Sequence, residues 1–228
     1  MNQGPINADI VIVPNFGGWG NVPLNQAIDL EPVISGVQQY LESLGLQTIV
    51  APYRRAPAIF PEEPDFDIKL AVITEMLGLH HTRARHFARI LETLALENSN
   101  TKFLLLGLSN GAGFIDNTME YIAPVVEDRV AAVAIGIPFW HSRYVNDNII
   151  HLDNGGNDPV TQGKVEDLFG EALRTIFLKF YSLVNGRAPK WEEGWRISGH
   201  EYKWEEIRPV VIHFINHRLL KYDSSLHH

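Results

Sequence analysis

The chain has 228 residues, of which 45% are hydrophobic and 20% are charged, and its formal net charge is −8. This length and composition are typical of one globular domain, here spanning residues 1–228, with a full hydrophobic core. The acidic balance and the lack of a Lys/Arg-rich face argue against nucleic acid as a partner, and the absence of cysteine excludes disulfides and thiolate metal sites.

The N-terminal sequence contains no stretch typical of a signal peptide or a membrane helix. Residues 1–5 carry no basic side chain, and the apolar run at 10–13 is far too short to cross a bilayer. We therefore expect no membrane span and a cytoplasmic location.

Apolar runs and helical periodicities alternate along the chain. Short apolar runs predict buried strands at 10–13, 48–51, 103–106, 130–137 and 148–152, with a weaker sixth strand at 195–198. Apolar positions at helical spacing predict helices at 30–44, about 68–96, 110–122, 165–184 and 208–220, the last with Pro209 in its first turn. This alternation predicts an α/β fold, a three-layer α/β/α sandwich around a mostly parallel sheet of about six strands.

A G-x-S-x-G motif runs from Gly107 to Gly111, directly between a predicted strand and a predicted helix. A turn this sharp forces its serine into strained backbone angles, and glycines two residues before and after avoid collisions. The strain holds the Ser109 hydroxyl clear of the backbone, and the helix N-terminus beneath it favours developing negative charge. We predict Ser109 as a nucleophile and the N–H of Asn110 as an oxyanion donor.

Two other interpretations of this glycine-rich turn stay open. It could bind a phosphate, although the lysine of a P-loop and the G-x-G-x-x-G fingerprint are both missing. It could also be a tight turn with no chemical role.

A serine nucleophile needs a base, and His200 is the best placed of the ten histidines. It follows the last weak strand and precedes the last helix, so it should lie at the same sheet edge as the serine turn. Asp158 follows the fifth strand, in a turn set by two glycines and a proline, where its carboxylate could orient the histidine. Asp153, closer to the strand end, is the rival acid.

Three other histidines, His80, His81 and His86, fall close together on or beside a predicted helix. Arginines are interspersed among them and would repel a cation, and no carboxylate has the spacing of a metal ligand. We expect neither a metal nor a cofactor.

The serine turn, the Gly-Gly-Asn-Asp-Pro-Val segment at 155–160 and the pair Gly199-His200 together resemble the α/β-hydrolase superfamily. The likeness extends from Ile10 to about Leu220 and is greatest to small bacterial esterase- and lipase-like members. It implies an α/β-hydrolase fold that lacks the usual antiparallel hairpin at the N-terminus and has no large cap domain.

The resemblance also implies a second oxyanion donor in the loop after the first strand. Family members commonly carry His-Gly there, whereas this chain has Pro-Asn-Phe-Gly-Gly at 14–18. By position, the N–H of Phe16 would be that donor.

Together these residues predict a serine hydrolase that cleaves a small-molecule carboxylic ester, or a thioester, by two-step acyl transfer through Ser109, Asp158 and His200. Substrate-lining aromatic residues are expected near strand ends and flanking loops, at Trp19, Phe139, Trp140 and Trp195. Most of them could instead be packing residues. The alternatives are a catalytically silent ligand-binding or scaffold protein, and a perhydrolase or lyase on the same fold.

Overall fold

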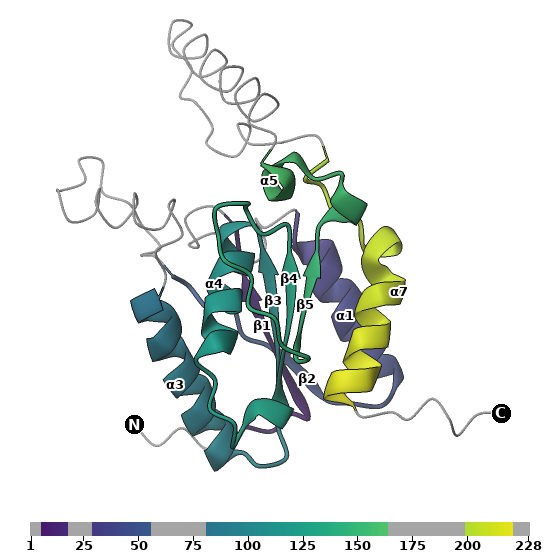
Figure 1. The fold of residues 1–228 in the computed structure, drawn as a ribbon. Helices are drawn as coiled ribbons and strands as arrows, with labels where there is room; N and C mark the ends of the chain where they lie inside the picture. The colour runs from purple at the N-terminus through teal and green to yellow at the C-terminus, as the bar shows by residue number, and fades with distance from the viewer. Residues whose placement is uncertain (1–5, 18–28, 56–80, 164–198, 221–228) are drawn as a thin grey trace, which may run out of the picture.

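The computed structural model describes residues 6–17, 29–55, 81–163 and 199–220 (Figure 1). Within these ranges, five strands form one sheet in the order β2-β1-β3-β4-β5, and every neighbouring pair is parallel. The strands are β1 (Ile10–Asn15), β2 (Thr48–Val50), β3 (Lys102–Leu108), β4 (Val130–Ile135) and β5 (Ile149–Leu152). The predicted parallel α/β sheet is confirmed, whereas the expected strand at 195–198 and helix at 165–184 lie outside the described residues.

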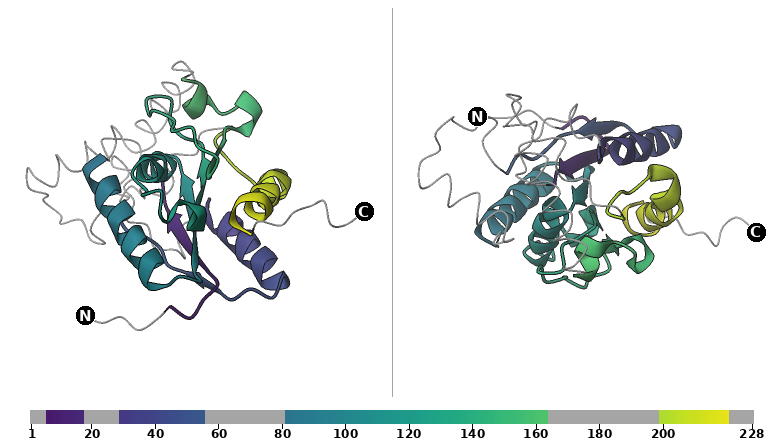
Figure 2. Two further views of the ribbon diagram at one scale, coloured as in Figure 1. Left: turned by 60° about the horizontal axis from the view of Figure 1, so that its bottom comes forward. Right: turned by 90° about the horizontal axis from the view of Figure 1, so that it is seen from above.

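Helices cover both faces of the sheet (Figures 1 and 2). The helices α1 (Glu31–Ser43) and α7 (Trp204–Phe214) lie together on one face. The helices α3 (His81–Glu97) and α4 (Asn110–Glu120) cover the other. These layers confirm the predicted three-layer sandwich.

The three central strands, β1, β3 and β4, are mostly apolar because both of their faces are buried. In β1, Val11 and Val13 pack in the core under α3 and α4, whereas Ile10 and Ile12 pack in the core under α1 and α7. Successive side chains of a strand point to opposite faces, so a sheet with two covered faces needs continuous apolar runs rather than an alternating pattern.

The closing helix α7 begins at Trp204, which is earlier than the predicted start at 208, so Pro209 lies inside the helix and not in its first turn. Packing explains the early start. A Cβ at Gly36 of α1 would overlap the Trp204 ring, so the indole lies directly against the backbone of α1. The contact between the two helices anchors the first turn of α7, and this burial outweighs the hydrogen bond that Pro209 cannot donate.

Three connections meet at the edge formed by the carboxyl ends of the strands. They are the turn from β3 into α4, the segment after β5 with η3 (Asn154–Gly156) and α5 (Pro159–Gln162), and the segment 199–203 before α7. In open α/β sheets this edge is where ligands bind.

Candidate active site

Ser109 sits on a strained turn between β3 and α4. Its backbone angles, φ 55° and ψ −123°, lie outside the regions that ordinary residues occupy. Its N–H donates to the carbonyl of Ile135 at 2.8 Å, and its own carbonyl accepts from the N–H of Gly113 at 3.1 Å. The predicted strain is therefore present, and these bonds to β4 and α4 hold it.

The two glycines of the motif make room for close backbone contacts. A Cβ at Gly107 would lie 2.6 Å from the Gly111 carbonyl oxygen, and a Cβ at Gly111 would overlap the carbonyl oxygen of Asn15. The end of β1 thus packs directly on the serine turn. A Cβ at Gly17 would lie only 3.4 Å from that of Ser109, so the segment after β1 runs beside the serine.

Asp158 is fully buried and caps the short helix α5. Its Oδ1 accepts the Val160 N–H at 2.8 Å. Its Oδ2 accepts two donors, the His200 Nδ1 at 2.7 Å and the Tyr202 hydroxyl at 2.5 Å. A buried carboxylate with three donors is well compensated for the loss of water.

The charge state of this carboxyl follows from its partners. Burial by itself raises the pKa of Asp158, but the His200 hydrogen bond and charge, with the bonds from Tyr202 and Val160, outweigh burial and hold the pKa below its ordinary value. Burial and the neighbouring carboxylate raise the pKa of Tyr202 far above its usual range. Asp158 is therefore an anion at neutral pH, and Tyr202 is a neutral donor to it.

The His200 ring lies beside the serine turn, over the first residue after β4. A Cβ at Gly136 would lie 2.6 Å from the ring's Cε1. Gly136 directly follows Ile135, the residue whose carbonyl binds the Ser109 N–H, so the imidazole and the serine occupy neighbouring strand ends. Among the described residues, no hydrogen bond joins the Ser109 hydroxyl to the ring. Such bonds are often long in unliganded sites and tighten when substrate binds.

The rival acid, Asp153, has a different partner. Its Oδ1 accepts the Gly156 N–H at 3.3 Å and caps η3. Within the described part of the chain, the carboxylate that contacts His200 is Asp158.

Sequence reasoning missed Tyr202 and Gly136. The signal for Tyr202 was its place two residues after His200, next to the helix that closes the sheet. The signal for Gly136 was a glycine directly after a β-strand that neighbours the serine strand. Neither pattern is specific without the tertiary contacts.

The predicted substrate residues divide into two groups. Phe139 and Trp140 follow β4 and are 48% and 47% exposed, and their rings meet edge to face at 5.1 Å. The N–H of Phe139 donates to the Val160 carbonyl, which ties this aromatic pair to the helix that Asp158 caps. Trp19 and Trp195 lie outside the described residues.

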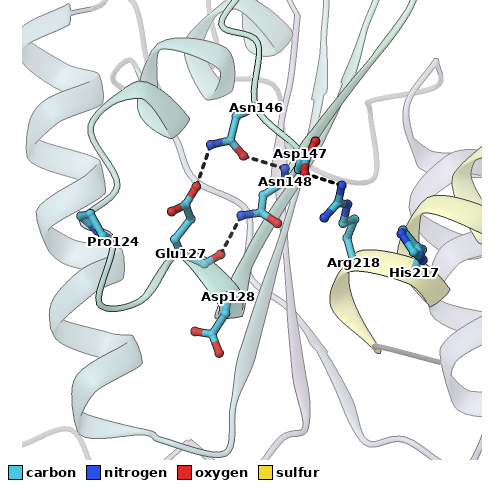
Figure 3. Close-up of a pocket in the computed structure, with 8 residues that line it drawn as sticks. All are labelled: Pro124, Glu127, Asp128, Asn146, Asp147, Asn148, His217 and Arg218. Atoms are coloured by element: carbon cyan, nitrogen blue, oxygen red, sulfur yellow. Dashed lines mark hydrogen bonds and ion pairs between the residues drawn. The ribbon is translucent and has the colours of Figure 1, made fainter. Parts of the chain in front are cut away.

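A polar hollow of about 450 Å³ lies at the opposite edge of the sheet, before β4 and β5 (Figure 3). Its residues hydrogen-bond to one another: the Asn146 side chain donates to the Glu127 carboxylate at 2.6 Å, and the Asn148 side chain donates to the backbone carbonyl of Glu127 at 3.2 Å. Arg218 pairs with Asp147 at 2.7 Å. These bonds join the starts of β4 and β5 to the C-terminal helical segment, far from the serine turn.

The fold and this site define an α/β protein that carries a strained serine and, at the carboxyl edge of a parallel sheet, a histidine bonded to a buried aspartate. In the described ranges, no helix is long and apolar enough to cross a membrane. No cluster of three or more potential metal ligands occurs among the same residues.

No protein-family model and no curated protein matches the chain. Among solved structures, it is similar to a Trichoderma reesei cutinase in complex with a C11Y4 phosphonate inhibitor, with 17% sequence identity and a TM-score of 0.48. The match covers 68% of this chain and 65% of the cutinase chain, which is less than two thirds of that protein. The α/β fold of this chain accordingly rests on its own sheet order and helical layers.

Proposed function

We propose that the protein is a serine hydrolase that cleaves carboxylic esters, or thioesters, through an acyl-enzyme on Ser109. The observation that carries the proposal is the His200 imidazole, which is bonded to the buried Asp158 at 2.7 Å and lies over Gly136, beside the strained serine. A base held in one tautomer next to an accessible nucleophile is what acyl transfer requires, and Ser109 is partly exposed.

In the first step, His200 Nε2 takes the hydroxyl proton while Ser109 Oγ bonds to the carbonyl carbon. The carbonyl oxygen becomes an oxyanion, which the N–H groups of Phe16 and Asn110 stabilise. The tetrahedral intermediate then expels the alcohol or thiol, which receives the proton from His200. Water attacks the acyl-enzyme in the same way, giving its proton to His200, and the acid is released with Ser109 regenerated.

Asp158 would serve by staying ionised. Its hydrogen bond to Nδ1 places the ring proton there and leaves Nε2 free to accept the serine proton. Because its partners hold the pKa of Asp158 below the ordinary value, it remains an anion while the imidazole gains and loses its proton.

The exposed pair Phe139 and Trp140 supports an apolar substrate group. Two large rings, each about half exposed beside the site, offer apolar surface that an acyl or alcohol chain can cover. Burying such a chain contributes roughly 0.8 kcal/mol per methylene group, so longer chains should bind more tightly.

The direct test uses Ser109→Ala with a panel of p-nitrophenyl esters and thioesters of increasing chain length. We expect wild-type turnover and labelling by a fluorophosphonate probe, and neither in the variant, whose circular dichroism should match the wild type. Labelling of Ser109→Ala would reveal another nucleophile. A wild-type protein that binds esters without turnover would be a silent ligand-binding protein.

The acid has a matched control in the same loop. Asp158→Asn removes the acceptor of the His200 N–H and should lower kcat by about 10⁴, as for a triad aspartate held in this role. Asp153→Asn changes a carboxylate that caps η3. It should lower kcat by less than about tenfold, because Asp158 is the carboxylate that contacts His200. The reverse ranking would assign the orienting role to Asp153.

A further inference from the structure

A buried arginine contacts both residues that supply the expected oxyanion donors. Arg55 is only 6% exposed. Its Nη1 donates to the carbonyl of Asn110 at 2.9 Å, and its Nη2 donates to the carbonyl of Phe16. One planar guanidinium therefore bridges the segment after β1 and the serine turn after β3.

The approach of Arg55 to Phe16 continues the pairing of two strands. Beyond β2, the Ala51 N–H donates to the Ile12 carbonyl at 2.9 Å, and the Tyr53 N–H donates to the Pro14 carbonyl at 3.1 Å. At the next position of this ladder, the carbonyl of Phe16 receives the Arg55 guanidinium, whose second arm reaches Asn110. A side chain thus ties the segment after β1 to the serine turn.

The guanidinium is itself held in place from several sides. Its Cζ lies 5.5 Å from the centre of the Phe114 ring on α4, and the Arg55 carbonyl accepts a hydrogen bond from Arg83 of α3 at 3.2 Å. Tyr53, two residues earlier, stacks on Phe87 with the ring centroids 4.0 Å apart. A fork that is fixed in this way can fix the backbone that it binds.

We infer that Arg55 is the positioning residue of the oxyanion hole. A hydrogen bond to a residue's carbonyl restrains the peptide plane that follows its Cα. Only the two backbone dihedrals of that residue separate this plane from its own N–H, so the bond also limits how far the N–H can turn. By holding the carbonyls of Phe16 and Asn110 together, Arg55 sets the distance between the two N–H groups that receive the oxyanion. This inference rests on the proposed function, because the role of the two N–H groups belongs to it.

The effect should fall on the transition state rather than on substrate binding. Oxyanion donors act on charge that develops during the reaction, and loss of one such donor lowers kcat by about 10²–10³. Arg55→Ala removes neither N–H group but lets both drift, so we expect it to lower kcat by about tenfold to hundredfold. KM should change less than about threefold, because the lost restraint acts on the transition state and not on the bound substrate.

The chain offers a matched control in Arg129, a half-buried arginine that also donates to a backbone carbonyl, that of Ala95, at the opposite edge of the sheet. Arg129→Ala should lose stability without losing kcat. Arg55→Lys keeps the charge but lacks the fork, so it should behave like Arg55→Ala. This second variant also serves if Arg55→Ala does not fold.

The experiment measures kcat, KM and the inhibition constant of an alkyl boronic acid, which forms a tetrahedral adduct with a serine nucleophile. We expect the inhibition constant to rise by the same factor by which kcat/KM falls, in Arg55→Ala and Arg55→Lys and not in Arg129→Ala. Added guanidinium chloride, below denaturing concentration and against equal sodium chloride, should partly restore Arg55→Ala alone.

A kcat within threefold of wild type in both Arg55 variants would overturn the inference, as would a loss of kcat with an unchanged inhibition constant and no rescue. The proposed function is judged separately, by Ser109→Ala. If that variant keeps its activity, the proposed function fails. Amide hydrogen exchange at Phe16 and Asn110 then tests the role of Arg55 without any activity. If Arg55 fixes these N–H groups, they should exchange faster in Arg55→Lys than in Arg129→Ala, and equal exchange rates would overturn the inference.

Discussion

The hydrogen bond from Tyr202 to Asp158 offers a quantitative test of how the buried carboxylate is stabilised. Tyr202→Phe removes one hydroxyl and keeps the ring, which is 7% exposed and packs in the core under α1 and α7. The lost bond, 2.5 Å long, ends on a carboxylate that is completely buried. Hydrogen bonds to charged groups contribute about 1.5–3 kcal/mol, so the free energy of unfolding at pH 7 should fall by that amount. For a chain of this size the melting temperature should drop by roughly 3–12 °C.

A matched control separates the effect of the charged acceptor from that of losing a tyrosine hydroxyl. The Tyr40 hydroxyl donates to the Asn216 Oδ1, also at 2.5 Å, but this acceptor is neutral. Tyr40→Phe should therefore cost only about 0.5–1.5 kcal/mol. Urea unfolding followed by tryptophan fluorescence measures both variants.

The free-energy cost of Tyr202→Phe should depend on pH, because its hydrogen-bond acceptor is a carboxylate. The pKa of folded Asp158 is depressed, so the stability that it contributes is complete above its ordinary pKa and is lost as the pH falls through the lower folded value. The cost of Tyr202→Phe should thus shrink as the pH falls below about 4, whereas that of Tyr40→Phe should stay constant. Equal costs for the two variants at pH 7, with the same pH dependence, would refute the reasoning.

Three further predictions follow from the site. Gly136→Ala introduces a Cβ 2.6 Å from the His200 ring, at φ +63°, and should lower kcat at least about tenfold. The control Gly45→Ala, at φ +81° with nothing within 4 Å of the added Cβ, should cost about 1 kcal/mol of stability and leave kcat unchanged. Equal kcat values in the two variants would contradict this prediction. Asp158→Asn should make the unfolding free energy less dependent on pH below about pH 4, which acid titration by circular dichroism would show, and an unchanged slope would speak against the depressed pKa. Trp140→Ala should raise KM more for long-chain than for short-chain p-nitrophenyl esters, and a uniform rise would mean that the exposed ring does not contact the chain.

The sequence predicted what depends on local pattern. Continuous apolar runs indicated doubly covered strands, and the glycine spacing around Ser109 indicated the strained turn, since both follow from the backbone of a few neighbouring residues. Asp158 could be preferred over Asp153 because its position past the strand end allowed it to turn back toward the histidine.

The remaining features arise from contacts between distant segments. Gly111 is required because the end of β1 packs on it, and nothing in the motif itself reveals that neighbour. Arg55 and Tyr202 belong to the site because β2 and α7 bring them there, and each looks like an ordinary polar residue in the sequence. The start of α7 was placed too late because the docking of Trp204 on Gly36 is also a tertiary contact.

The order in which the segments meet at the sheet edge has a consequence during protein synthesis. The ribosome delivers Ser109 well before Asp158 and His200, and domains acquire structure as their segments emerge. The nascent chain can form the strained turn at Ser109 while His200, the proposed base, is still untranslated. If His200 is the base, as we propose, the growing polypeptide stays unreactive toward acyl donors until the segment that carries the imidazole packs beside Asp158.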